Sequence, residues 1–373
     1  MRVLVTTNAA VDHFLPLAPT VAALVADGHD VRVGCPESFA PFVRRTGFDP
    51  WPCRETAAST PAPPAPPAEE RQARLMWAVT RGWPADCRGW VDSLLEQAAA
   101  WEPHLVIVEP VEHAGRVVAS ALGAPLVVHG WGFALPVGVD EIAAEGIRDV
   151  YDAVSTTPSG PVLVVDMGPA SVQAANAAPA RRYRYRPFSV PDQPVPPAEA
   201  ERRRVLVTLG TYAHADAAAL MRAAADAALQ AGADVLVVAG HQDRLAGDPF
   251  PSEVVVLSWV DMVAAMQSCD LVVHHGGAGT SWTALSCGTP AAVLPLAGEQ
   301  FRNAQILATA GAAAVCPSRD HDGLASAITS ALNEPRLAAR AAAIARDNQA
   351  LPDTADRVGD LVSIGNSSAV EAT

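Results

Sequence analysis

The stretch LVVHHGGAGTSW, residues 271–282, predicts a strand, a glycine-rich turn and the start of a helix. Such turns bind phosphate, because small residues expose backbone N–H groups and the start of the helix adds a partial positive charge. The G-x-G-x-x-G spacing of a dinucleotide-binding fold is absent, because Trp282 stands where the third glycine after Gly277 and Gly279 is required. A phosphate-loop lysine is excluded, since all 26 basic residues are arginines. We therefore expect His275 and backbone amides to hold an anion here.

The bulk composition favours a globular protein with two domains. The chain has 373 residues, of which 50% are hydrophobic and 18% charged. The net charge of −14 argues against nucleic acid and anionic membranes as partners. The six cysteines form no CxxC pair, which is typical of reduced thiols. No signal peptide and no apolar run of about 18 residues is evident, so we expect a cytoplasmic protein, with a homodimer left open.

The pentapeptide RVLVT occurs twice, at residues 2–6 and 204–208, each time ending in a polar turn. After each copy a helical pattern ends at a glycine, Gly28 or Gly232, and another apolar run follows. Both halves therefore begin with the same β-α-β unit, which predicts buried parallel strands. The alternation predicts doubly wound α/β domains, whose ligands bind beyond the carboxyl ends of the strands. Further strands are expected at residues 104–109, 125–130, 234–240, 254–259, 270–275 and 291–296.

Two proline-rich segments interrupt this pattern. Residues 186–203 separate the halves and predict a semi-rigid connector. Residues 59–70 predict an exposed loop, with a mobile flap over a substrate as the alternative. We expect four parts: a first domain at 1–190, a linker at 191–203, a second domain at 204–351, and at 352–373 a tail whose helix packs back on the first domain.

At this point the chain resembles a known family, the GT-B glycosyltransferases that use nucleotide-diphosphate sugars. It is most similar to actinomycete enzymes that attach deoxysugars to natural products. The resemblance is carried by HFLPLAPTVAALVADGHDV (13–31), RYRPFSVP (184–191), VLVTLGT (205–211), LSWVDM (257–262), HHGGAGTSWTALSCGTPAAVLP (274–295) and GEQFRNA (298–304).

This resemblance implies two Rossmann-like α/β domains whose parallel sheets face each other across a cleft. The first domain would bind the acceptor and the second the nucleotide sugar. The implied activity is an inverting, metal-independent hexosyl transfer from a nucleotide-diphosphate sugar to a hydrophobic aglycone, with no further cofactor.

The glycine-rich turn then has a specific role. When the sugar leaves its nucleotide, negative charge builds up on the diphosphate and needs preorganised donors or a metal. Backbone amides of residues 277–280, the Thr280 hydroxyl and His275 supply donors, and Gly210 and Thr211 approach from the other turn. The donor-binding residues implied by the resemblance are Gly210, Thr211, Trp259, Val260, His275, Gly277, Ala278, Gly279, Thr280, Glu299 and Gln300.

Three of these positions bear on the nucleotide and the sugar. Trp259 is expected to stack on the nucleobase. Thr283 stands where many relatives that use uridine diphosphate sugars carry a ribose-binding glutamate, which favours a thymidine diphosphate donor. Glu299 and Gln300 match an acidic residue and glutamine that bind sugar hydroxyls, although the usual aspartate is replaced by glutamate.

The resemblance places the catalytic base at His13, after the first strand. A histidine has a pKa suited to deprotonating an acceptor hydroxyl. A base histidine commonly has a carboxylate behind it, and Glu109, at the end of the strand 104–109, is the residue expected to orient His13. Glu112 lies one turn away. Asp12 replaces the glycine usual before this histidine.

Four aromatic residues are expected to line the acceptor pocket, with packing in the core as the alternative for each: Trp77, Trp83, Trp131 and Phe133. The segment RDHD, residues 319–322, contains a two-carboxylate pattern that some glycosyltransferases use for metal. Because it lies late in the second domain, we interpret it as a turn and helix N-cap.

Two alternative functions remain open. A nucleotide-sugar epimerase shares the GT-B architecture, but it needs no hydrophobic acceptor pocket. A catalytically inactive homologue would bind a sugar nucleotide and activate a partner; the presence of His13 does not favour it.

Overall fold

The structure is a computed structural model of the chain. Most of the proline-rich segment 59–70 and part of the connector 186–203 lie outside the described residues, so the predictions made for them cannot be compared with the structure. The described residues are 1–56, 64–66, 70–188, 190, 194–197, 202–211, 216–240 and 249–370.

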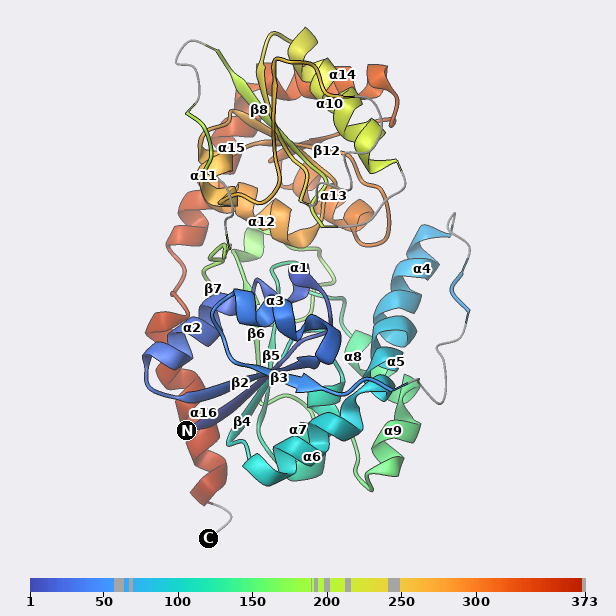
Figure 1. The fold of residues 1–373 in the computed structure, drawn as a ribbon, viewed down its shortest axis with the longest axis vertical. Coiled ribbons are helices and arrows are strands. Elements are labelled where there is room, and N and C mark those ends of the chain that lie inside the picture. The colour runs from blue at the N-terminus through green and yellow to red at the C-terminus, as the bar shows by residue number, and fades with distance from the viewer. Residues whose placement is uncertain are drawn as a thin grey trace. The chain divides into compact units, whose positions relative to one another are not determined.

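The chain divides into two compact units (Figure 1). The first unit contains Met1–Met167, Ala174–Arg184 and Pro352–Thr373. The second contains Gly168–Gln173 and Tyr185–Leu351. Each unit has a sheet of parallel strands, as the sequence predicts, and helices pack on the sheet.

In the described part of the first unit the strand order is β3-β2-β1-β4-β5-β6-β7, and every pair is parallel. The order reverses at β1, so β1 and β4 are neighbours and their carboxyl ends border a switch point of the kind where α/β folds bind ligands. The strands are β1 (Arg2–Thr6), β2 (Asp30–Pro36), β3 (Pro50–Cys53), β4 (Leu105–Val108), β5 (Leu126–His129), β6 (Leu163–Met167) and β7 (Arg181–Tyr183).

Helices connect these strands. The segment from α4 to α5 is a nearly continuous helix, with a π-helical turn, η2 (Ala78–Gly82), between the two. No helix in the described residues is long and apolar enough to cross a membrane. The helices of this unit are α1 (Val11–Phe14), α2 (Ala18–Ala26), α3 (Ala40–Arg45), α4 (Arg71–Trp77), α5 (Trp83–Asp86), α6 (Val91–Trp101), α7 (Ala114–Leu122), α8 (Val139–Gly146), α9 (Arg148–Ala153) and α16 (Val358–Val370), with the 3-10 turns η1 (Glu37–Phe39), η3 (Cys87–Gly89) and η6 (Ala355–Arg357).

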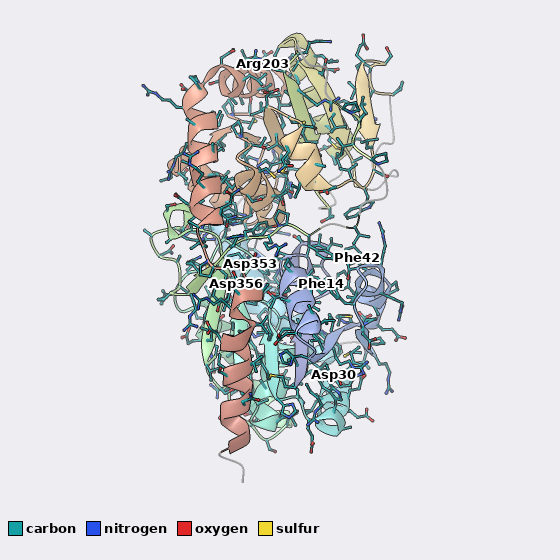
Figure 2. All side chains as sticks on the ribbon, turned by 90° about the vertical axis from the view of Figure 1, so that its left-hand side faces the viewer. Phe14, Asp30, Phe42, Arg203, Asp353 and Asp356 are labelled. Carbon is teal, nitrogen blue, oxygen red and sulfur yellow. The ribbon has the colours of Figure 1, made fainter. Side chains whose placement is uncertain are left out.

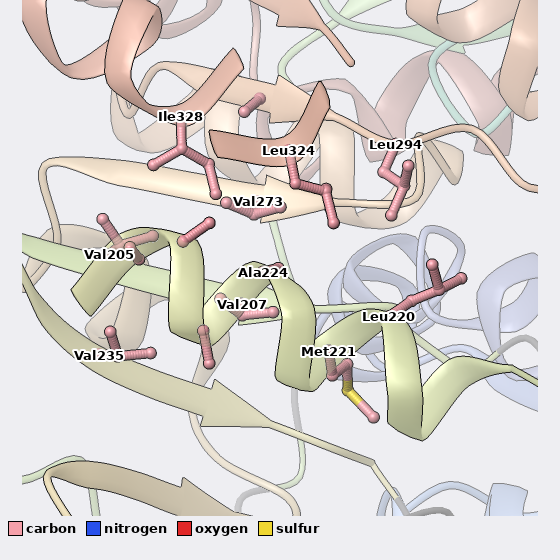
Figure 3. Close-up of a cluster of buried hydrophobic side chains, with 14 of the residues drawn as sticks. Val205, Val207, Leu220, Met221, Ala224, Val235, Val273, Leu294, Leu324 and Ile328 are labelled. Atoms are coloured by element: carbon pink, nitrogen blue, oxygen red, sulfur yellow. The ribbon is translucent and has the colours of Figure 1, made fainter. Parts of the chain in front are cut away.

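The second unit repeats this plan, with the parallel strand order β10-β9-β8-β11-β12-β13. In its core, valines of the sheet such as Val207 pack against the inner faces of α10 and α14. These helices contribute Ala224 and Ile328 (Figure 3). The elements are η4 (Ala170–Val172), β8 (Arg204–Thr208), α10 (Ala217–Gln230), β9 (Asp234–Val238), β10 (Val254–Leu257), α11 (Met262–Gln267), β11 (Leu271–His274), α12 (Ala278–Cys287), β12 (Ala291–Val293), α13 (Gln300–Thr309), β13 (Ala313–Val315), α14 (His321–Asn333) and α15 (Pro335–Gln349).

Two short segments fall in a different unit from the one expected. Residues 168–173 belong to the second unit, where Gly168 packs so closely that an added Cβ would lie 2.2 Å from the Trp282 ring. Residues 185–190 also belong there, and Tyr185 stacks on Trp282 with ring centroids 6.0 Å apart. The first unit therefore ends earlier than residue 190, because aromatic packing holds these segments to α12.

The C-terminal helix α16 belongs to the first unit (Figure 2). Asp353, just before it, lies 3.6 Å from Arg184, and Asp360 within it lies 3.1 Å from Arg181. Gly365 packs against Met1, where an added Cβ would lie 2.0 Å from the methionine methyl group. The end of the chain thus completes the unit in which the chain begins.

Candidate functional site

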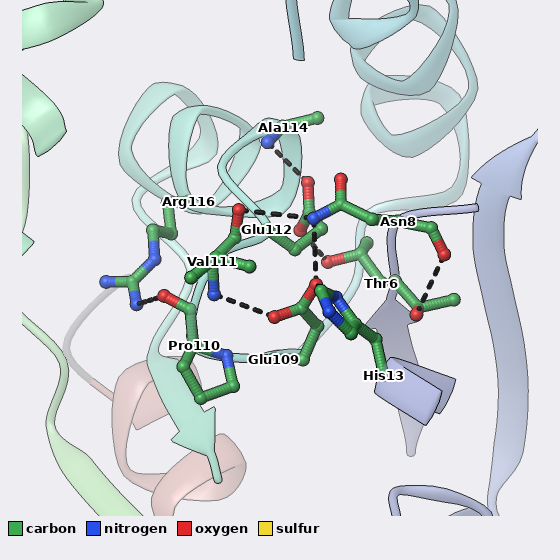
Figure 4. A network of polar contacts seen from close by, with 10 residues as sticks. Thr6, Asn8, His13, Glu109, Pro110, Val111, Glu112, Ala114 and Arg116 are labelled. Atoms are coloured by element: carbon green, nitrogen blue, oxygen red, sulfur yellow. Dashed lines mark hydrogen bonds and ion pairs between the residues drawn. The ribbon is translucent and has the colours of Figure 1, made fainter. Parts of the chain in front are cut away.

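His13 and Glu109 form a hydrogen-bonded pair in the first unit (Figure 4). His13 Nδ1 lies 2.9 Å from Glu109 Oε1. His13 lies in α1, just after β1, and Glu109 follows β4. Because β1 and β4 are parallel neighbours, their carboxyl ends bring the two side chains together. The Glu109 side chain is fully buried, and that of His13 is 12% exposed.

Two further donors hold the carboxylate of Glu109. Asn8 Nδ2 donates to Oε1 at 2.8 Å, and the Val111 amide donates to Oε2 at 2.7 Å. A buried carboxylate needs such partners, because losing water without replacement is costly. Since a carboxylate only accepts hydrogen bonds, Nδ1 of His13 is the donor in this contact. Sequence reasoning missed Asn8; its polar side chain two residues after the end of β1 is the signal that was available.

Two tryptophans flank the imidazole of His13. The ring centroid of Trp83 lies 4.7 Å from it and that of Trp131 lies 4.4 Å from it. Both tryptophans pack against a small apolar cluster of Val79, Val111 and Val139. Apolar surface therefore borders the imidazole of His13.

The structure shows other contacts for the remaining two predicted acceptor residues. Trp77 ends α4 and packs over Gly82, where an added Cβ would lie 2.9 Å from the indole. Phe133 is 2% exposed and lines a cavity whose described walls do not include His13. Trp83 and Trp131 are thus the predicted acceptor residues with an observed ring contact to the candidate base.

The turn that carries Trp131 is fixed by Asp166. Asp166 Oδ1 accepts from the Gly132 amide at 2.8 Å, and Oδ2 accepts from Arg182 at 3.0 Å. Burial raises the pKa of Asp166, and the charge of Arg182 opposes this rise. An added Cβ on Gly130 would lie 2.2 Å from Oδ1, so only glycine fits there. Nothing in the sequence analysis singled out Asp166, because β6 was not recognised as a strand.

Glu112 forms a second buried carboxyl group close to this pair. It accepts hydrogen bonds from the Thr6 hydroxyl and from the Gly115 amide, the latter at 3.0 Å to Oε2, at the start of α7. Burial raises its pKa to about 7, and the nearby charge of Glu109 adds to the rise. Glu112 thus ties β1 to α7 beside the candidate base.

In the second unit, His275 lies between two glycines that its ring requires. An added Cβ on Gly210, after β8, would lie 2.6 Å from Cε1 of His275. An added Cβ on Gly277 would lie 2.3 Å from Nε2. Gly210 also has a φ of +62°, which favours glycine. The turns that follow β8 and β11 therefore meet around this imidazole.

The turn between His275 and α12 is locked by its neighbours. His274 Nδ1 accepts from the Gly276 amide at 3.0 Å, and Asn303 Nδ2 donates to the Gly276 carbonyl at 2.9 Å. Burial lowers the pKa of His274 to about 3, with the charge of His275 as a smaller cause, so this ring stays a neutral acceptor. The first turn of α12, residues 278–280, is half-buried and carries the N–H groups that a helix leaves unpaired.

Trp259 and Val260 lie between β10 and α11, with Trp259 half-buried and Val260 buried. Asp261 caps α11, as expected, by accepting from the Val263 amide at 2.9 Å. Thr211 follows β8 and is half-buried. These residues follow the carboxyl ends of the strands, at the same edge of the sheet as His275.

The Glu299–Gln300 pair begins α13. Glu299 is exposed, whereas Gln300 is 2% exposed and its Oε1 accepts from the amides of Leu296 and Ala297 at 2.9 and 3.2 Å. The side-chain oxygen of Gln300 therefore holds the preceding loop. Glu299 is the member of the pair whose side chain faces solvent.

Thr283 is 6% exposed, and its hydroxyl donates to the Gly279 carbonyl at 2.7 Å. The Tyr185 hydroxyl donates to the same carbonyl at 3.2 Å. The Thr283 side chain therefore bonds within its own helix, and a direct contact with a ribose gains no support from this geometry.

The segment 319–322 begins α14. Asp320 accepts from the Gly323 amide at 2.8 Å, which confirms the interpretation as a helix N-cap. Within the residues that the structure describes, no group of three or more His, Cys, Asp or Glu side chains could hold a metal ion.

The chain matches one family in both halves. The N-terminal domain of the erythromycin biosynthesis protein CIII-like family matches residues 68–210, and its C-terminal domain matches residues 222–364. The chain is 32% identical over 349 residues to L-demethylnoviosyl transferase of Streptomyces niveus, with 87% of each chain covered.

Solved structures with the same fold include glycosyltransferases in complex with thymidine diphosphate. The SsfS6 complex, from Streptomyces sp. SF2575, is 27% identical with a TM-score of 0.84, and the match covers 97% of this chain and 99% of that one. Spinosyn rhamnosyltransferase SpnG in complex with thymidine diphosphate is 26% identical with a TM-score of 0.84 and covers 97% and 100%.

Proposed function

Because the chain belongs to the erythromycin biosynthesis protein CIII-like family and is a GT-B glycosyltransferase of the natural-product deoxysugar type, we propose that it moves a deoxysugar from thymidine diphosphate to a hydroxyl group of a hydrophobic aglycone. The transfer inverts the configuration of the sugar and requires no metal ion. The single observation that carries this proposal is the His13–Glu109 pair, with its apolar surroundings.

In the proposed mechanism, His13 Nε2 takes the proton of the acceptor hydroxyl as the oxygen attacks the sugar. Glu109 holds the ring in the required tautomer, because Nδ1–H donates to Oε1. The same carboxylate stabilises the imidazolium that forms. Trp83 and Trp131 keep water from the ring and offer apolar surface to the aglycone.

The departing diphosphate is bound by the second unit. His275 and the N–H groups of the first turn of α12 are donors preorganised for the charge that develops on the phosphate oxygens. Thymidine as the nucleoside is supported by the two thymidine diphosphate complexes of similar enzymes. With donors of this kind, the charge of the leaving group is met without a metal ion.

The test incubates the purified protein with a thymidine diphosphate deoxysugar and a panel of polycyclic and macrocyclic aglycones. We expect glycoside and thymidine diphosphate in equal amounts, an undiminished rate in EDTA, and inverted anomeric configuration by NMR. A matched reaction with the uridine diphosphate sugar should be slower. Conversion of the donor sugar without acceptor would instead indicate an epimerase, and binding without turnover an inactive homologue.

A further inference from the structure

Asn8 and His13 donate to the same oxygen of Glu109. Asn8 Nδ2 lies 2.8 Å from Oε1 and His13 Nδ1 lies 2.9 Å from it, whereas Oε2 accepts from the Val111 amide at 2.7 Å. Asn8 lies two residues after β1 and is 3% exposed, so this contact is inside the first unit (Figure 4). The proposed proton transfer involves only His13 and Glu109, which leaves the effect of Asn8 on the base to be explained.

The orientation of the Asn8 side-chain amide follows from its two partners. Besides Glu109, Nδ2 has the Val111 carbonyl as an acceptor, at 3.2 Å. A carboxylate and a carbonyl only accept hydrogen bonds, so an amide turned the other way would place its own oxygen against two acceptors. Nδ2 is therefore the atom that faces Glu109, and Asn8 ties the end of β1 to the turn after β4.

Two donors on one oxygen share its negative charge. A hydrogen bond to a carboxylate stabilises the anion and draws part of its charge toward the donor. The imidazolium of His13 is stabilised by the same oxygen that Asn8 contacts. Asn8 should therefore weaken the stabilisation that Glu109 gives to the protonated ring.

We propose that Asn8 is a positioning residue that limits the basicity of His13, by holding Oε1 of Glu109 and drawing on the charge that the imidazolium would otherwise receive. This role rests on the proposed function in which His13 is the base, although the interaction itself needs no substrate. A base works best when its pKa lies near the working pH, and it must release the proton before the next turnover. Because Val111 holds Oε2, loss of Asn8 leaves the carboxylate beside His13 and strengthens the pair.

Glu112, just before α7, is the neighbouring carboxyl that titrates in the same pH range. Burial raises its pKa to about 7, and the nearby charge of Glu109 adds to the rise. Asp12, beside His13 on α1, is exposed, and the two tryptophans that flank the imidazole carry no charge. The effect of Asn8 must therefore also appear in a Glu112→Gln background, where this second carboxyl cannot ionise.

The experiment titrates the ring protons of His13 by NMR in the protein without substrate, with the signals assigned by comparison with His13→Ala. Asn8→Leu keeps a branched side chain and removes the donor. We expect the pKa of His13 to rise by about 0.5–1 unit, a part of the roughly 1–2 units that one hydrogen bond to a charged group represents. The rise should persist with Glu112→Gln, and kcat/KM should reach its plateau at a correspondingly higher pH, the opposite direction to Glu109→Gln.

Asn348→Leu is the matched control, because Asn348 is also a buried asparagine whose Nδ2 donates to backbone, at 3.1 Å from the Tyr185 carbonyl. It should leave the pKa of His13 unchanged. Thermal unfolding checks that both variants are folded, and Asn8→Ala with Asn348→Ala replaces them if either is not.

An unchanged or lower pKa of His13 on loss of Asn8, or an equal rise in the Asn348 variant, would overturn the proposal. The NMR result does not depend on sugar transfer. A raised pKa of His13 in a protein that glycosylates no acceptor would therefore support the role of Asn8 and contradict the proposed function instead.

Discussion

Glu109 Oε1 accepts hydrogen bonds from both His13 Nδ1 and Asn8 Nδ2, at 2.9 and 2.8 Å, while the carboxylate itself is fully buried. The carboxylate is thus fixed in place before any substrate binds. The imidazole that it orients lies beside the rings of two tryptophans. This arrangement is what a base for an acceptor hydroxyl requires: one tautomer, a stabilised cation and little water.

Glu109→Gln tests the role of that charge. The amide has no negative charge to stabilise the imidazolium, so the pKa of His13 in the variant should be lower than in the parent protein. Because the neutral ring is the active form, activity should rise at a lower pH, and the maximal rate should fall by less than it does in His13→Ala. The measurement is the pH profile of kcat/KM; an unchanged profile would remove Glu109 from the account.

Glu112→Gln tests the second buried carboxyl. Burial raises the pKa of Glu112 from 4.5 to about 7, so the folded protein holds the proton more tightly than the unfolded chain does. The stabilising contribution of the protonated group is present below pH 4.5 and is lost as the pH rises through 7. The amide cannot ionise, so the variant should gain about 3 kcal/mol of stability relative to the parent between pH 4.5 and 8. Denaturant unfolding measures this gain.

The matched control for this change is Glu96→Gln, on the exposed face of α6. Its difference in unfolding free energy from the parent should not vary with pH. A constant difference for Glu112→Gln as well would show that Glu112 ionises normally in the folded protein.

Gly210→Ala tests the packing of His275. The new methyl group would lie 2.6 Å from the imidazole and displace it, which should weaken thymidine diphosphate binding and lower turnover in the same direction as His275→Ala. Loss of one donor to developing charge commonly costs about 2.7–4 kcal/mol in kcat. Gly232→Ala is the control, because Gly232 also has a positive φ of 77° but has no atom within 4 Å of its added Cβ. Equal effects of the two changes would mean that backbone strain alone is responsible.

Trp131→Ala tests the acceptor surface. Removing the ring 4.4 Å from His13 should raise the acceptor KM by about tenfold and leave thymidine diphosphate binding unchanged. Trp51→Ala removes an indole of the same unit that packs on Trp101, at 5.1 Å between ring centroids, and should change neither quantity. Steady-state kinetics with varied acceptor decides, and an unchanged KM in Trp131→Ala would assign the ring to packing.

Much of the fold was predictable, because parallel strands buried on both faces are continuous apolar runs such as residues 2–6 and 271–274. Three of the strands missed lack this signal, whereas β6, LVVDM, has an apolar run and was missed despite it. β3 is PWPC, and its two prolines are tolerated because it is an edge strand. β7 is RRY, also at an edge, and β13 has three residues.

The site was predictable where strand ends determine it. His13 and Glu109 meet because β1 and β4 are neighbours, and the family resemblance named both residues. Asp166 could not be found, because its partner Gly132 is 34 residues away and the contact depends on the pairing of β5 with β6. The roles of Gln300 and Thr283 also needed coordinates, since each uses its side-chain oxygen on nearby backbone.

The central claim is that His13 is the base, and a single-turnover experiment with His13→Ala tests it most directly. Enzyme in excess over thymidine diphosphate deoxysugar and acceptor reports the chemical step, while calorimetry reports thymidine diphosphate affinity. His321→Ala, at a histidine of the second unit whose side chain is 41% exposed, is the control. We predict that His13→Ala slows glycoside formation by about 10²–10⁴-fold with thymidine diphosphate affinity unchanged and the control at the parent rate. Glycoside formation by His13→Ala at the parent rate would contradict the account.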